Sequence, residues 1–172
     1  MFSEIKKISS LLLSVAFSSI GFIASITVTV LAAREVSSNP LFVGFPNAVG
    51  VGGAVLGTRM IYLISKTNSQ LNALAFTFLI GAFGGAIMFY SLIIDSFLLL
   101  LLGAFILGIG QSATLQTRYA ASFVAGTKFK ATALSLAVWF SVFGSVFGPR
   151  MVGSYSNFFE NIFNSELIVG YV

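Results

Sequence analysis

The chain contains no cysteine and no histidine, and charged residues make up only 8% of its 172 residues. Without these two residue types it has no disulfide framework, no thiolate metal site and no imidazole proton carrier. Soluble domains carry about 25% charged residues, so this chain has too few charges to cover a water-facing surface. Its nine lysines and arginines form no basic stripe of the kind that binds nucleic acid. We therefore expect a non-enzyme with no cofactor, no bound metal and no nucleic-acid partner.

Hydrophobic residues make up 57% of the chain, with 19 phenylalanines and 17 glycines. Long uncharged stretches separate the few charges, and each approaches the ~20 residues that a helix needs to cross ~30 Å of hydrocarbon. The pattern predicts an all-α, polytopic membrane helix bundle formed by a single domain over residues 1–172. The five expected transmembrane helices cover residues 11–33, 41–64, 71–90, 97–117 and 131–154.

Apolar runs occur near both ends of the chain. Lys6 and Lys7 precede an apolar run about twice as long as the ~7–15 residues of a signal-peptide core, which favours a retained first helix over a cleaved leader. At the other end, residues 155–172 are expected to form an outer loop and the start of a truncated sixth helix. The closing apolar run, 167–172, is too short to span a bilayer.

The distribution of lysines predicts which side of the membrane holds the N-terminus. Positively charged residues concentrate in short cytoplasmic loops. With a cytoplasmic N-terminus, Arg34 alone lies near an outer helix end, whereas five lysines lie inside: Lys6, Lys7, Lys66, Lys128 and Lys130. We therefore expect an integral protein of the cytoplasmic (inner or plasma) membrane with its N-terminus inside.

A seven-residue pattern, G-x-x-x-G-x-R, occurs at residues 53–59 and again at 144–150. The second and fifth helices run in opposite directions, so the two copies fit an inverted three-helix repeat of the kind found in secondary transporters. Chance recurrence is the alternative, because paired glycines also simply let helices approach closely. Either way, four glycines are candidates for helix packing: Gly53, Gly57, Gly144 and Gly148. Arg150 follows Pro149, and either reaches the interface or lines a polar cavity.

The fourth expected helix carries a polar stripe. Gln111, Thr114 and Arg118 are spaced i, i+3 and i+7, which places them on one helix face. They either form hydrogen bonds between helices, with Arg118 anchored in the headgroups, or line a translocation pathway.

Two further positions, Trp139 and Asn47, are candidates for the same pathway. Trp139 shares a helix face with Thr132 and Ser135, and it is too deep for an interfacial aromatic belt. It is either core packing or a cavity wall that contacts a substrate. Asn47 is a lone polar residue in the second helix, with either a structural or a pathway role.

The C-terminal part of the chain resembles the major facilitator superfamily. Gly144, Gly148, Pro149 and Gly153 look like the fifth-helix signature of its proton-coupled antiporters. Residues 115–121 and 133–139 are similar to one branch of permeases in that superfamily. The resemblance implies the N-terminal half of a facilitator fold, with helices 1, 2, 4 and 5 facing a central cavity. It favours the pathway role for four residues, Asn47, Gln111, Arg118 and Trp139, and a pivot role for the fifth-helix motif.

These observations predict the N-terminal half, or a fragment, of a facilitator-type secondary transporter that exports small molecules by alternating access. Because alternating access needs two bundles, the expected partners are the lipid bilayer and a second transporter half or further copies of this chain. The substrate is not identified, although cations without carboxylates favour neutral or anionic cargo. The alternative is a small membrane scaffold or assembly subunit, without transport activity, that binds other helices through its small-residue faces.

Overall fold

The computed structural model describes residues 2–36, 42–125, 129–143 and 146–147, and the regular elements in this part of the chain are helices. They are α1 (Phe2–Val36), α2 (Phe45–Thr67), α3 (Gln70–Ile93), α4 (Phe97–Val124) and a shorter helix, Phe129–Phe143. In this part of the chain, four helices, α1 to α4, are long and apolar enough to cross a membrane. The all-helical membrane fold expected from composition agrees with this architecture.

The helix bounds differ from the expected spans mainly at the ends. α4 continues past Thr117 to Val124, because an arginine such as Arg118 limits an uncharged interval without breaking the backbone hydrogen bonds of a helix. Of the fifth expected span, the structure describes the helix Phe129–Phe143 and two further helical residues at 146–147. The expected outer loop and sixth helix, residues 155–172, lie outside the described residues.

Local sequence signals set the short connections between the helices. The Ser69 hydroxyl caps α3 by accepting a hydrogen bond from the Asn72 N–H at 3.2 Å, and Ser96 caps α4 in the same way. Asp95, between α3 and α4, has φ +50°, a left-handed conformation that aspartate tolerates better than most residues. Pro46 occupies the first turn of α2, where its missing N–H costs nothing. These turns make successive helices antiparallel.

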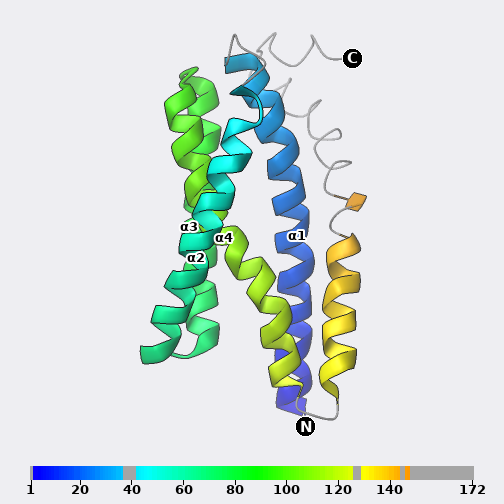
Figure 1. The fold of residues 1–172 in the computed structure, drawn as a ribbon. Coiled ribbons are helices and arrows are strands. Elements are labelled where there is room, and N and C mark those ends of the chain that lie inside the picture. The colour runs from blue at the N-terminus through cyan, green and yellow to red at the C-terminus, as the bar shows by residue number, and fades with distance from the viewer. Residues whose placement is uncertain (1, 37–41, 126–128, 144–145, 148–172) are drawn as a thin grey trace.

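α4 is the central helix of the structure. It contacts α1, α2 and α3, and packs most extensively on α3 and α2. Figure 1 shows the C-terminal part of α4 crossing towards α1, with the helix Phe129–Phe143 running beside α1. α2 and α3 pack along much of α4, from Gly103 to Ala120. The C-terminal part of α4 also faces α1 and the last described helix.

Glycines let α2 approach α4 closely. Gly53 and Gly57 of α2 are buried against α4, and a Cβ on Gly53 would stand 2.9 Å from the Phe105 carbonyl carbon. Gly108 of α4 faces the Gly50 carbonyl, where a Cβ would collide with the oxygen. The structure thus places the two sequence-predicted glycines of α2 directly on α4, in the close backbone contact that small residues allow between helices in lipid.

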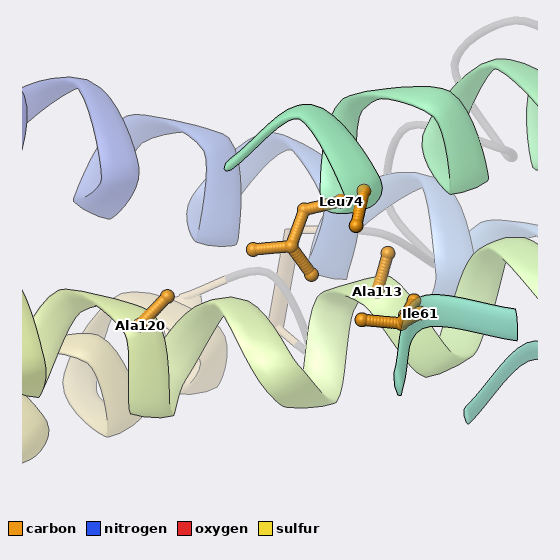
Figure 2. Packing of buried hydrophobic residues seen from close by; sticks show 5 residues of the cluster. Ile61, Leu74, Ala113 and Ala120 are labelled. Atoms are coloured by element: carbon orange, nitrogen blue, oxygen red, sulfur yellow. The ribbon is translucent and has the colours of Figure 1, made fainter. Parts of the chain in front are cut away.

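Many of the buried apolar residues in the described part of the chain belong to two clusters. One, beside α1, contains Ala33, Met88, Leu100 and Ala104. The other joins α2, α3 and α4 through Ile61, Ala73, Leu74, Ala113 and Ala120. Figure 2 shows Ile61 and Leu74 reaching towards the small alanine side chains of α4. Large residues on α2 and α3 therefore pack over alanines on the central helix, a combination that favours dense packing.

Basic residues lie at both ends of the bundle, in unequal numbers. The N-terminus, the α2–α3 connection and the C-terminal end of α4 lie at one end (Figure 1). At that end the Lys66 Nζ lies 4.5 Å from the Tyr62 ring centroid, and the Lys130 Nζ lies 4.8 Å from that of Phe123. Exposed Arg34, in the last turn of α1, is at the opposite end.

Candidate functional site

A pocket of about 100 Å³ lies where α1, α4 and the helix Phe129–Phe143 meet. α4 supplies half of its lining, including Gln111, Thr114 and Arg118, which stand on one wall as their helical spacing predicts. In the described part of the chain, the residues that line it are Ser19, Phe22, Ile23, Gln111, Thr114, Leu115, Arg118 and Ser141. Polar groups from three helices therefore converge on one small space, beside apolar side chains from α1 and α4.

Two polar atoms of the pocket residues are buried without a hydrogen-bond partner in the described part of the chain. They are the Ser19 Oγ and the Arg118 Nε. Ser19 is only 4% exposed, and Arg118 is half-buried. A buried polar group left unsatisfied costs about 1–3 kcal/mol. Both atoms therefore have unused hydrogen-bonding capacity beside the pocket.

Other buried hydroxyls on these helices are satisfied locally. Thr77, Ser112 and Thr117 each donate to a backbone carbonyl one turn earlier in their own helix, at 2.7–2.8 Å. Such bonds satisfy a hydroxyl in an apolar environment without a partner from another helix. The contrast sets Ser19 apart from these hydroxyls, because its oxygen is equally buried and lacks this bond.

The pocket lies deep in the apolar part of the bundle. Ser19 belongs to the apolar segment Leu12–Val30, and at ~1.5 Å per residue it lies about 10 Å from the start of that segment. The hydrocarbon core is ~30 Å thick, so Ser19 and Ile23 occupy its middle third. Arg118 lies six residues before the end of α4, and its side chain lines the same pocket. A charged residue within a membrane-spanning helix is costly and usually marks a functional position. Arg118 is the one charged residue among those that line the pocket, and no carboxylate lies among them.

Two curated proteins are similar to the chain over most of its length. It is 32% identical over 146 residues to the uncharacterized MFS-type transporter YdeG of Bacillus subtilis (strain 168), covering 85% of this chain and 34% of that protein. It is also 32% identical over 157 residues to the uncharacterized MFS-type transporter YddS of the same organism, covering 91% and 36%. MFS denotes the major facilitator superfamily.

This chain belongs to the major facilitator superfamily. The resemblance noted in the sequence is thus confirmed, and the relatives are transporters rather than enzymes. This facilitator-superfamily chain spans about a third of the length of the curated relatives it matches. No protein-family model matches it, and no solved structure matches it significantly.

The structure places two sequence-predicted pathway residues of this facilitator-superfamily chain outside the pocket. Asn47 is half-buried in the first turn of α2. Trp139 is 65% exposed, and Thr132 and Ser135, on the same face, are also exposed. That face points away from the other described helices. Arg150 and the packing residues Gly144, Gly148, Pro149 and Gly153 lie outside the described residues, and so does most of the second copy of the repeat.

Sequence reasoning missed Ser19 and Ser141 as pocket residues. α1 carries several hydroxyl residues, including Ser18, Ser25 and Thr29, which bond to their own helix backbone. No sequence signal separates Ser19 from them. Its place in the pocket follows from the crossing of α4 over α1, which depends on tertiary packing.

Proposed function

We propose that this chain contributes a solute site to a facilitator-type transporter of small molecules, and that the pocket around Gln111, Thr114 and Arg118 is that site. The observation that carries the proposal is the convergence of these side chains with Ser19 at mid-membrane depth. A cavity with a few convergent polar groups on mainly apolar walls is the usual form of a small-molecule site. Transporters of this kind place their substrate sites near the bilayer midplane.

The proposed mechanism is alternating access, in which two helix bundles rock about the central site. The helices described here would form one bundle. The second would come from another polypeptide segment or from a further copy of this chain. We also propose export as the direction, because residues 144–153 carry the antiporter-like motif.

The proposed orientation has the N-terminus in the cytoplasm. The end of the bundle that holds the N-terminus also holds Lys66 and Lys130, whereas Arg34 lies at the other end. This asymmetry agrees with the excess of basic residues in cytoplasmic loops. The proposed location is therefore the cytoplasmic membrane.

A scaffold or assembly role is less well supported. That role would use small-residue faces to bind other helices. Gly53 and Gly57 of α2 are turned inwards onto α4, and Gly84 of α3 meets the α4 backbone at Leu107. These surfaces are already occupied within the chain, so they are not available for partner helices.

Reconstitution tests the proposal. The affinity-tagged chain would be isolated from its native membrane in mild detergent, so that companion chains remain bound, and incorporated into lipid vesicles. The vesicles would be incubated with a defined mixture of anionic, neutral and cationic small solutes, and mass spectrometry would identify those that enter. We expect at least one solute to enter faster than in protein-free vesicles, and Arg118→Gln to remove most of this flux.

Arg59→Gln is the matched control, because Arg59 is exposed on α2 and does not line the pocket. It should keep full flux. Entry no faster than in protein-free vesicles would refute the transport proposal. Equal flux in the two arginine variants would remove the pocket from the pathway.

A further inference from the structure

We infer that the pocket binds an organic oxyanion, a carboxylate or phosphate group held at Arg118 with its apolar remainder against Phe22, Ile23 and Leu115. This inference rests on the proposed function, because it names the class of solute for the same pocket. It is carried by the charge of the lining, by its unpartnered donors and by the division of the walls into polar and apolar parts.

The charge of the lining determines the sign of the ligand. Arg118 gives the pocket one positive charge, and no aspartate or glutamate is among the described residues that line it. In a site of low dielectric a positive charge without a counter-charge is costly, and an anion that enters lowers this cost. A cation would be repelled by the same guanidinium, and a neutral solute would leave the charge uncompensated.

The available donors suit an oxyanion. The Arg118 Nε is buried without a partner in the described part of the chain, and the planar guanidinium can present this N–H together with a terminal N–H to two oxygens at once. The Ser19 hydroxyl, 4% exposed and also unpartnered, can donate to the same group. Gln111 and Thr114 add neutral donors on the α4 wall. Charged and neutral donors around one cavity are what a carboxylate or phosphate requires.

The remaining walls set the shape of the ligand. Phe22 and Ile23 of α1 and Leu115 of α4 give the pocket an apolar side. A volume of about 100 Å³ admits an oxyanion group with a small hydrocarbon body. Benzoate has this form, with a planar carboxylate on an aromatic ring. Benzamide has almost the same shape without the charge, so the two solutes make a matched pair.

Thermal unfolding of the purified chain with its companions, in neutral detergent and at constant ionic strength, tests the inference. The solutes are benzoate, benzamide and inorganic phosphate. We expect benzoate or phosphate near saturation to raise the Tm by roughly 3–6 °C, and benzamide at the same concentration to have no effect. Arg118→Gln should weaken anion binding more than about tenfold, whereas Arg118→Lys should retain part of it.

Two further variants separate a site from a general charge effect. Ser19→Ala removes one donor without changing the charge and should weaken benzoate binding severalfold. Arg59→Gln removes an exposed arginine outside the pocket and should leave it unchanged. If Arg118→Gln fails to fold, the comparison of Ser19→Ala with Arg59→Gln still decides. An equal rise in Tm in all variants, or a rise with benzamide as large as the rise with benzoate, would overturn the inference.

The oxyanion could belong to a solute or to a lipid headgroup. A second set of Tm measurements distinguishes these two sources. The same measurement is repeated with phosphatidylglycerol or with phosphatidylcholine added to the micelles. A shift with phosphatidylglycerol alone that is lost in Arg118→Gln assigns the oxyanion to a lipid. A shift with soluble benzoate or phosphate assigns it to a solute. Both outcomes support an oxyanion site, and no shift from either source contradicts it.

The two proposals fail in different ways. Anion binding that depends on Arg118, without solute entry into vesicles, retains the site and refutes transport. Entry of neutral or cationic solutes through the pocket, without any anion-dependent Tm shift, retains transport and refutes the anion site.

Discussion

Gly81 of α3 and Gly110 of α4 lie back to back, with no room for a side chain on either. A Cβ on Gly81 would stand 2.6 Å from the Gly110 Cα, and a Cβ on Gly110 would stand 2.5 Å from the Gly81 Cα. These distances are shorter than any ordinary carbon–carbon contact, and both neighbouring atoms belong to the backbone. The pair therefore sets how closely α3 can approach the central helix.

Replacing either glycine of this pair should destabilise the bundle. Gly81→Ala or Gly110→Ala must push α3 away from α4, and overpacking of this kind costs about 1–3 kcal/mol. Unfolding of the purified chain in detergent, followed by circular dichroism, measures the loss. Gly85→Ala is the matched control, because its Cβ would meet the Leu107 Cδ1 at an ordinary 3.8 Å. Similar losses for Gly81→Ala and Gly85→Ala would show that α3 and α4 do not meet at this pair.

The general architecture could be predicted from the sequence because the hydrocarbon interior of a membrane allows few backbone structures. Backbone groups in hydrocarbon must be bonded within their own segment, so long uncharged stretches become helices. A charged residue, however, does not end a helix. α4 continues beyond Arg118 to Val124, a length that an uncharged interval cannot reveal.

For the candidate site, the sequence predicted which residues of α4 share a face. It did not predict which residues of other helices lie opposite them. A period of 3.6 residues places Gln111, Thr114 and Arg118 on one face whatever surrounds them, and the structure puts that face in the pocket. The choice of Ser19 and Ser141 as its neighbours depends on the contacts that α1 and the helix Phe129–Phe143 make with α4. Those contacts lie between helices, where periodicity within one helix carries no information.

Trp139 should contribute little to the stability of the chain. Its ring is 65% exposed, so Trp139→Ala should change the free energy of unfolding by less than about 0.5 kcal/mol, as at other exposed sites. Ala137 lies on the opposite face of the same helix and is fully buried, so Ala137→Leu should cost about 1–3 kcal/mol. Parallel unfolding of the two variants in detergent is the measurement. A large loss in Trp139→Ala would mean that the ring packs into a core.

Thr114 should be reachable from water if the pocket belongs to a solute pathway. The chain has no cysteine, so a single introduced thiol reports its own position. Thr114 is 5% exposed and lines the pocket. Thr114→Cys should therefore react with a small water-soluble thiol reagent, which requires a thiolate in contact with water. Benzoate should slow this reaction if it occupies the same space.

Thr77 provides the comparison for this labelling experiment. It is fully buried, and its hydroxyl donates to the Ala73 carbonyl at 2.8 Å, away from the pocket. Thr77→Cys should react at least about tenfold more slowly, because an apolar site also disfavours the thiolate. Equal rates at the two positions, or no effect of benzoate on Thr114→Cys, would contradict an aqueous route to the pocket.

The proposed orientation can be tested with two exposed positions at opposite ends of the bundle. Arg34 lies in the last turn of α1. Asn68 directly follows α2, at the end of the bundle that holds Lys66. In intact cells a membrane-impermeant maleimide should label Arg34→Cys and not Asn68→Cys, because basic residues favour the cytoplasmic side. Both should be labelled once the cells are permeabilised, which controls for thiol reactivity. The opposite pattern in intact cells would place the N-terminus outside and would reverse every inside and outside position assigned to the loops.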